Sequence, residues 1–194
     1  MGDNFSIAHK FTLSWEGGET DDAADRGGFT KFGVSTAFLN DIASTQAGRD
    51  VLDRMGVILP VTRNTIRNLT ESLAASLFRW QMWDALKLDL IPLRPAVVIY
   101  DAAVNSGPRQ SVKFAQRGYN ACVAYGQPLD VDGILGPATR KAMQQADTDK
   151  ILMSMLDQRE TFYHDLVAAK PSQEVFLRGW LNRVDDLRRY VRGL

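Results

Sequence analysis

The chain has 194 residues, of which 45% are hydrophobic and 24% are charged. These values suit one compact globular domain, or one domain with a closely packed extension. Lys and Arg number 23, as do Asp and Glu, so no overall field favours binding to nucleic acid or to an anionic membrane. No stretch approaches the ~20 apolar residues of a transmembrane helix, so we expect no stable membrane insertion. We also expect the protein to be a monomer.

Cysteine content and the N-terminus bear on the compartment. Cys122 is the only cysteine, which excludes an internal disulfide and favours folding in a reducing cytoplasm. Residues 1–5 have neither the basic region nor the apolar region of a signal peptide. We therefore expect synthesis in the cytoplasm without a signal peptide. A substrate outside the cytoplasm would require release or export by another system.

The hydrophobic periodicity predicts a mainly α fold. Apolar side chains recur at helical spacing from Phe5 to Trp15, and Gly17 and Gly18 then end this helix. Residues 18–34 are rich in Asp, Gly and Thr and predict a turn or a small β-hairpin. Caps, prolines and helical spacing predict seven further helices: Ser35 to about Gln46, Thr70 to Trp83, Pro95 to Asn105, about Gln110 to Tyr125, one from about Ala138, Asp147 to Ala169, and Phe176 to Val191.

Two carboxylates near the first predicted helix form a candidate catalytic pair. Glu16 and Asp25 are nine residues apart (25 − 16 = 9). Glu16 follows a helix C-terminus, whose dipole raises a carboxyl pKa if the group is also partly buried near Trp15, as a general acid requires. Asp25 lies in a polar, Gly-rich segment whose backbone N–H groups favour its ionised form. Glycosidic-bond cleavage uses one protonated and one ionised carboxyl group.

Structural roles remain open for the same residues. Glu16 also fits a surface position beside a glycine cap, and Asp25 fits an aspartate that stabilises a turn. Asp21 and Asp22 are rival second carboxylates. Thr30 is expected to orient a water or a sugar hydroxyl, or else to lie in a short strand.

Metal and thiol chemistry have little support. His9 and His164 lack the paired spacing of zinc ligands. Asp130 and Asp132 lack the other ligands of a calcium loop. Cys122 is expected to be an inert core thiol. We therefore predict no metal and no cofactor.

The segment around the carboxylates resembles a known family. WEGG at residues 15–18 and DRGGFTKFGVS at residues 25–35 resemble the "EGG … D-x-GG-x-T-x-x-GIT/S" signature of glycoside hydrolase family 108. That family comprises N-acetylmuramidases found as phage endolysins and as secretion-activator proteins. The resemblance implies that Glu16 is the catalytic acid. The order Glu16, Asp25, Thr30 is also similar to the Glu/Asp/Thr arrangement of phage-type lysozymes.

The second half has its own resemblance. IYDAAVNSG at residues 99–107 and VDGILGPAT at residues 131–139 are similar to the predicted peptidoglycan-binding segment that accompanies this family, and FLRGWLNRV at residues 176–184 resembles the family's C-terminal pattern. Together, the two resemblances cover most of residues 5–185.

Four residues of the first of these motifs are expected to bind substrate: Tyr100, Asp101, Asn105 and Ser106. At a helix end, Asn105 and Ser106 would present an amide and a hydroxyl to a sugar N-acetyl group. Alternatively, they form a helix cap that closes on Gly107.

The resemblance implies a lysozyme-like fold with a catalytic segment at residues 1–92 and a helical peptidoglycan-binding segment at residues 93–194, packed as one compact unit. It implies an N-acetylmuramidase that cleaves the β-1,4 bond between N-acetylmuramic acid and N-acetylglucosamine, with inversion by analogy with phage-type lysozymes. The expected partners are peptidoglycan glycan strands and, for delivery, a holin or an export system. The alternatives are a lytic transglycosylase and a non-catalytic peptidoglycan-binding secretion helper.

Overall fold

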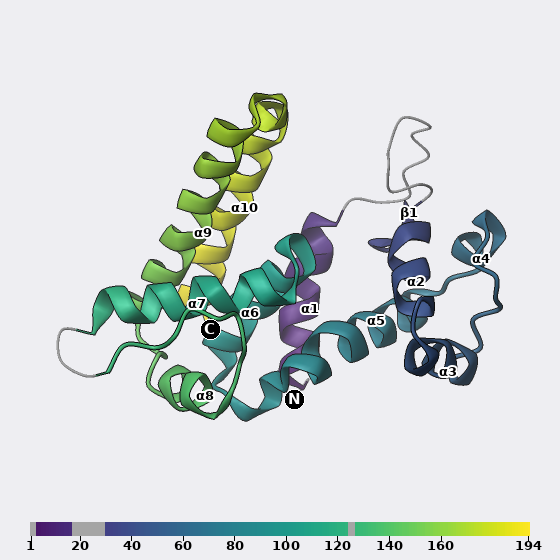
Figure 1. Ribbon diagram of the computed structural model, residues 1–194, viewed down its shortest axis with the longest axis horizontal. Helices are drawn as coiled ribbons and strands as arrows, with labels where there is room; N and C mark the ends of the chain where they lie inside the picture. The colour runs from purple at the N-terminus through teal and green to yellow at the C-terminus, as the bar shows by residue number, and fades with distance from the viewer. Residues whose placement is uncertain (1–2, 17–29, 124–126) are drawn as a thin grey trace. The chain divides into compact units, whose positions relative to one another are not determined.

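The computed structural model describes residues 3–16, 30–123 and 127–194. Helices make up most of this part of the chain (Figure 1), and its strands form one two-stranded antiparallel hairpin. The prediction of a mainly α fold with a small β-hairpin is therefore confirmed.

The elements follow one another along the chain in this order: α1 Asn4–Trp15, β1 Thr30–Lys31, β2 Val34–Ser35, α2 Thr36–Ala43, α3 Gln46–Arg54, α4 Arg63–Arg67, α5 Glu71–Phe78, the π-helical segment η1 Arg79–Asp84, the 3₁₀ turn η2 Leu88–Leu90, α6 Leu93–Ser106, α7 Pro108–Cys122, α8 Pro137–Gln144, α9 Asp149–Ala169, the 3₁₀ turn η3 Pro171–Gln173 and α10 Glu174–Arg192.

The contacts divide the chain into two compact units. The large unit combines Met1–Thr12 with Trp80–Leu194, and the small unit spans Leu13–Arg79. The large unit is therefore discontinuous in sequence, because the residues of the small unit lie between its two segments. The predicted segment boundary after residue 92 stays a prediction.

The hairpin of the small unit is closed by a tight turn. Thr30 pairs with Ser35 and Lys31 with Val34. Between the strands, Phe32 (φ 52°) and Gly33 (φ 76°) both adopt left-handed backbone conformations. Two such residues in a row form the two-residue turn whose twist matches that of the flanking strands.

Side-chain hydroxyls begin the helices of the small unit. Ser35 accepts a hydrogen bond from the backbone of α2, and Thr45, Thr62 and Thr70 do the same for α3, α4 and α5. The helix expected from Ser35 ends at Ala43, short of the predicted Gln46, and α3 then starts after the Thr45 cap.

The large unit is built around α6. Residues 95–103 of this helix are all buried, and a helix buried on every side lies inside its domain. Helices α7, α9 and α10 pack against α6, and the Tyr190 hydroxyl of α10 donates a hydrogen bond to the Ile7 carbonyl of α1 at 3.0 Å. The predicted helix end at Tyr125 lies outside the described residues, and α7 extends from Pro108 to Cys122.

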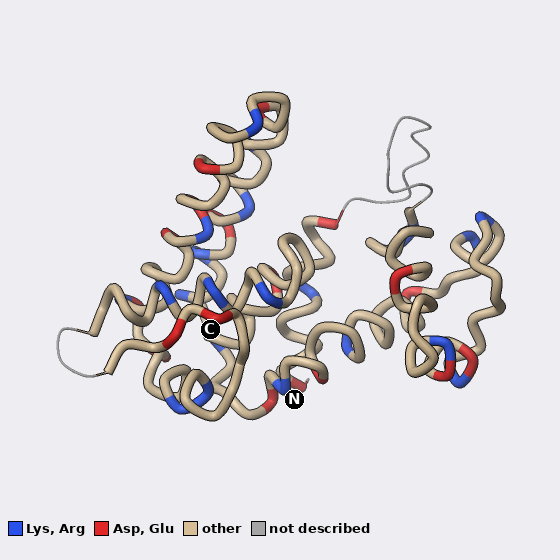
Figure 2. The backbone as a smooth tube through the Cα atoms, in the orientation of Figure 1, with Lys and Arg blue, Asp and Glu red and all other residues tan. Residues whose placement is uncertain are grey.

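Helices α9 and α10 form an antiparallel pair, visible in Figure 1. Charges of both signs are interspersed along the pair (Figure 2), and Arg188 of α10 binds Asp157 and Glu160 of α9 at 2.6 Å each. None of the helices in the described ranges is both long enough and apolar enough to cross a membrane.

Candidate functional site

Glu16 follows α1 directly and packs against the hairpin. Its side chain is half-buried. A Cβ atom added at Gly33 would lie 3.3 Å from Glu16 Cβ and 3.3 Å from Phe78 Cζ. Glycine at position 33 therefore meets two requirements, the positive φ of the turn and the space that the stem of Glu16 occupies.

The other predicted catalytic residues are described only in part. Thr30 begins β1 in the same small unit and is half-buried. Asp25 and its rivals Asp21 and Asp22 lie outside the described residues. The pairing of Glu16 with a second carboxylate thus stays a prediction.

Tyr100 lies in the core of the large unit. Its side chain is 0% exposed, and its hydroxyl shares a hydrogen bond with His9 Nδ1 at 2.8 Å. The rings of Phe5 and Trp83 lie edge-on to it, each with its centroid 5.7 Å away. The structure thus places Tyr100 among packed side chains, and substrate contact by Tyr100 stays a prediction that its burial does not support.

Asp101 is also 0% exposed and is the anion of a buried ion cluster. It accepts hydrogen bonds from Arg159 Nη1 at 2.6 Å, from Arg183 Nη2 at 2.8 Å and from Thr12 Oγ1 at 3.0 Å. Burial by itself raises the pKa of Asp101, but the charges of Arg159 and Arg183 and their hydrogen bonds bring it below its ordinary value. Asp101 is therefore ionised and fully occupied by core partners, so substrate contact by it likewise stays an unsupported prediction.

Asn105 and Ser106 end α6 at a half-buried position. Gly107 (φ 86°) closes the helix, and Pro108 begins α7. The cap expected at Gly107 is thus present. Asn105 Oδ1 accepts hydrogen bonds from the Tyr163 hydroxyl and from Ser106 Oγ, the latter at 3.0 Å. Asn105 and Ser106 are the two substrate-binding candidates that are both polar and partly accessible.

Sequence reasoning missed Arg159, Tyr163 and Arg183. Their side chains are 1%, 2% and 5% exposed, and they come from α9 and α10, at least 58 residues from Asp101. A signal was present, because Arg159 interrupts the apolar face of α9. Since arginine is almost never fully buried without a partner, an arginine at such a position indicates an acidic partner in the core.

The turn at residues 130–136 serves the fold. Gln116 of α7 is 1% exposed and donates hydrogen bonds to Asp132 Oδ1 at 2.8 Å and to Thr139 Oγ1 at 3.1 Å, while accepting one from the Gly133 backbone at 2.9 Å. The hydrogen bond from Gln116 contributes most to holding the pKa of Asp132 below its ordinary value. This turn is a hydrogen-bonded support for α8. Among the described residues, no cluster of His, Cys, Asp or Glu has the arrangement of a metal site.

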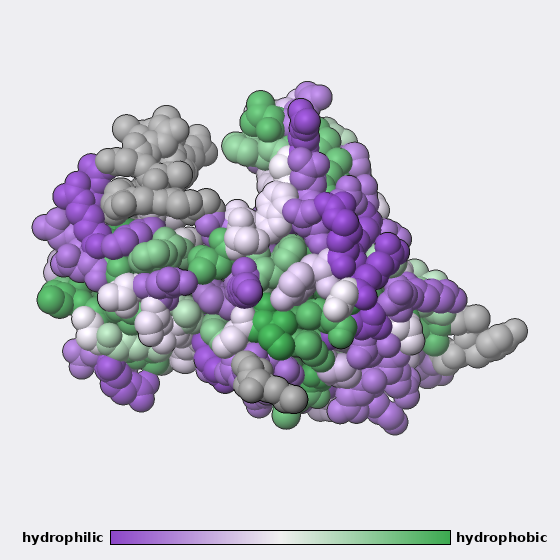
Figure 3. Space-filling model, turned by 180° about the vertical axis from the view of Figure 1, so that it is seen from behind, coloured by the Kyte–Doolittle hydropathy of each residue, from purple (hydrophilic) through white to green (hydrophobic). Residues whose placement is uncertain are grey.

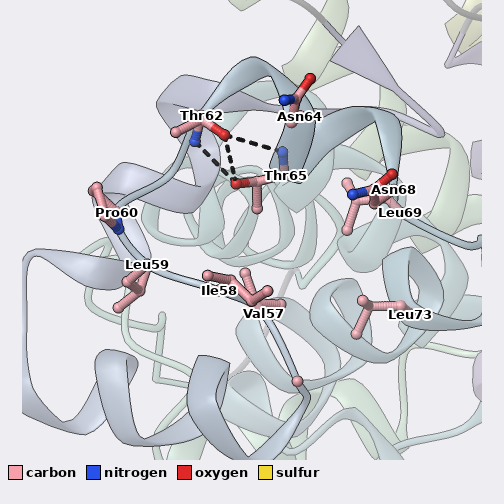
Figure 4. A pocket seen from close by; sticks show the side chains of 11 residues that line it. Val57, Ile58, Leu59, Pro60, Thr62, Asn64, Thr65, Asn68, Leu69 and Leu73 are labelled. Carbon is pink, nitrogen blue, oxygen red and sulfur yellow. Dashed lines mark hydrogen bonds between the residues drawn. The ribbon is translucent and has the colours of Figure 1, made fainter.

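A pocket of about 300 Å³ lies in the small unit between the Gly56–Pro60 loop, α4 and the start of α5 (Figure 4). Val57 and Leu69 form part of its buried lining, and Ile58 at its rim is 80% exposed. The hydroxyls of Thr62 and Thr65 bond each other in the cap of α4. No acidic, basic or histidine side chain lines this pocket, so it supplies no catalytic acid or base.

An exposed apolar patch lies at the free end of the α9–α10 pair, seen from behind in Figure 3. Val175 and Phe176 are 79% and 53% exposed there. The Phe176 ring stacks on Trp180 at 5.8 Å, and Trp180 stacks on Tyr163 at 4.9 Å. A row of aromatic rings thus leads from this patch to the residue that binds Asn105.

Comparison with protein families identifies the chain. Residues 9–107, just over half of the sequence, match the model described as "Glycosyl hydrolase 108". The chain belongs to glycosyl hydrolase family 108. Glu16, Thr30 and the whole of α6 lie within the matched part of this family 108 chain. Residues 110–185, which include Arg159, Tyr163 and Trp180, match the model described as "Predicted Peptidoglycan domain".

Solved structures include a similar fold. The structure of SagA from Brucella abortus superimposes with a TM-score of 0.74 at 24% sequence identity, and the match covers 97% of this family 108 chain and 94% of SagA. At that identity the likeness shows the fold alone. No curated protein sequence matches the chain.

Proposed function

We propose that this family 108 chain is a peptidoglycan hydrolase, an N-acetylmuramidase that cleaves the β-1,4 bond between N-acetylmuramic acid and N-acetylglucosamine. The observation that carries this proposal is the placement of Glu16. Glu16 is a half-buried residue directly after α1, and its stem packs closely against the glycine of the hairpin turn, where a Cβ at residue 33 would lie 3.3 Å from Glu16 Cβ. The match of residues 110–185 to a peptidoglycan domain supports glycan strands as the substrate.

In this mechanism Glu16 protonates the leaving glycosidic oxygen as the sugar develops oxocarbenium character. Asp25 activates the attacking water or stabilises the developing cation, with inversion by analogy with phage-type lysozymes. Thr30 orients the water or a sugar hydroxyl. Asn105 binds the substrate through its side-chain amide.

The proposal includes delivery. The chain is synthesised in the cytoplasm and acts on the cell wall after release through a holin pore or after export. Expression of the chain in bacteria with and without a holin tests the holin route. Lysis only when the holin is co-expressed would support it.

The decisive experiment compares Glu16→Gln with wild type on purified peptidoglycan. A loss of about two to four orders of magnitude in the rate of turbidity clearing is expected, because removing a general acid costs roughly 10²–10⁴-fold. Glu71→Gln, at an exposed position in the first turn of α5, is the matched control and should retain full activity. Retained activity in Glu16→Gln would show that another group is the acid.

Mass spectrometry of the products separates the alternatives. A hydrolase leaves reducing muramic acid ends, whereas a lytic transglycosylase leaves anhydro-muramic ends that are lighter by one water. Binding to cell walls without release of any soluble glycan fragment, with reducing or anhydro ends, would identify a non-catalytic peptidoglycan-binding protein.

A further inference from the structure

The carboxamide of Asn105 ends a directed chain of hydrogen bonds. Arg159 Nε donates to the Tyr163 hydroxyl at 2.7 Å, and the Tyr163 hydroxyl donates to Asn105 Oδ1. Ser106 Oγ donates to the same oxygen at 3.0 Å. Because a guanidinium group only donates, the direction of the chain is fixed from Arg159 outward.

This direction determines which end of the Asn105 amide faces inward. Tyr163 is 2% exposed. If the amide were turned over, the Tyr163 oxygen would receive two donors and its own buried proton would lack an acceptor, which costs free energy. With the oxygen inward, both of its lone pairs are used, and Asn105 Nδ2 donates no hydrogen bond to any other described residue. The accessible end of the side chain is therefore a donor.

A buried ion cluster holds the chain of hydrogen bonds in place. Asp101 binds Arg159 at 2.6 Å and Arg183 at 2.8 Å, and the three side chains are 0%, 1% and 5% exposed. Arg159 also lies beside the Tyr163 ring, with Cζ 5.7 Å from the centroid. Groups packed and paired in this way have little freedom to rotate, so the orientation of Asn105 is set before any ligand arrives.

We infer that Asn105 Nδ2 donates a hydrogen bond to the carbonyl oxygen of the 2-acetamido group of an amino sugar, and that Asp101, Arg159 and Tyr163 are positioning residues that fix this donor. A carbonyl oxygen accepts and never donates, so only the inward-oxygen orientation of Asn105 recognises it. The Ser106 hydroxyl has an internal role, because its proton is given to Asn105. The inference rests on the proposed function for the identity of the substrate.

The test uses the full chain with two readouts. Kinetics on N-acetylated and chemically de-N-acetylated peptidoglycan give the preference for the acetamido group. Calorimetric binding of tetra-N-acetylchitotetraose and of its de-N-acetylated counterpart, measured in a Glu16→Gln background, gives the same preference without cleavage. Tyr163→Phe should reduce this preference about fivefold, the value of roughly one neutral hydrogen bond, and should raise KM while changing kcat less than about twofold.

Two further variants complete the test. Tyr119→Phe is the matched control, because it removes the hydroxyl of a half-buried tyrosine on α7 that has no hydrogen-bond partner among the described residues. Its acetamido preference should equal that of wild type. Asn105→Asp keeps an acceptor for Tyr163 and Ser106 but replaces the donor with a second oxygen. It should abolish the acetamido preference even if Tyr163→Phe fails to fold.

The outcomes separate the two proposals. An unchanged acetamido preference in Asn105→Asp, or in folded Tyr163→Phe, overturns the inference, as does a wild type that binds both tetramers equally. A wild type that binds with the expected preference but releases no reducing sugar from cell walls overturns the proposed function and leaves the positioning of Asn105 intact.

Discussion

Removal of the Asp101 charge should destabilise the large unit severely. Asp101→Asn keeps the shape of the side chain and one acceptor oxygen, but it leaves the charges of Arg159 and Arg183 buried without an anion. Arg159 and Arg183 are 1% and 5% exposed, so solvent screens them little. Breaking a buried ion pair from one side costs about 3–5 kcal/mol, which corresponds to a fall of roughly 6–20 °C in Tm for a chain of this size.

The assay is urea unfolding followed by tryptophan fluorescence, since Trp80, Trp83 and Trp180 all lie in the large unit. Asp186→Asn is the matched control on α10, because Asp186 pairs with an Arg189 side chain that is 71% exposed. An exposed pair of this kind is worth roughly 0–1 kcal/mol. A loss of less than about 1 kcal/mol in Asp101→Asn would refute the reasoning that the cluster depends on its anion.

We also expect the stability difference between wild type and Asp101→Asn to depend on pH. The pKa of Asp101 is lowered in the folded protein, so its contribution to stability is complete above the unfolded value of about 3.9 and is lost as the pH falls through the folded value. The difference in unfolding free energy between wild type and Asp101→Asn should therefore be constant from about pH 5 to pH 8 and should narrow only below about pH 4. A difference that narrows between pH 8 and pH 5 would contradict this assignment.

Three glycine substitutions give further predictions. Gly118→Ala should destabilise by about 1–3 kcal/mol in thermal melts, because its Cβ would lie 2.5 Å from Met155 Cα; an unchanged Tm would contradict the close packing of α7 on α9. Gly179 lies at an exposed position of α10, where an added Cβ would have no atom within 4 Å, so Gly179→Ala should instead raise the free energy of unfolding by about 0.5–1 kcal/mol. Gly33→Ala strains the turn and crowds Glu16, so cell-wall clearing should fall while the large unit melts unchanged; wild-type clearing would show that the position of Glu16 tolerates the change.

Local signals predicted much of the fold. The spacing from Phe5 to Trp15 located α1, Ser35 was correctly identified as a helix cap, and the start predicted at Thr70 is where the structure begins α5. These signals are local in sequence, since a cap bonds a backbone group three residues away. The break between α2 and α3 was missed although a local signal was present, because Thr45 caps α3 by accepting a hydrogen bond from the Gly48 backbone.

The candidate site was less predictable than the helices, because its side chains pair with residues far away in the sequence. Asp101 looked like a polar residue available to substrate, and only its partners on α9 and α10 show it to be a core anion. The orientation of Asn105 depends likewise on Tyr163, which is 58 residues away. Pairings of this kind are set by tertiary packing, which the periodicity of a single helix does not contain.

The way in which α1 is held has a consequence for biosynthesis. Tyr190 of α10 donates a hydrogen bond to the Ile7 carbonyl, and its ring stacks on Phe11 at 4.8 Å. Ile7 leaves the ribosome 183 residues ahead of Tyr190. A nascent or truncated chain that ends before Tyr190 therefore lacks the partner that holds the start of α1, and the helix that leads to Glu16 is fully docked only after residue 190 has left the ribosome.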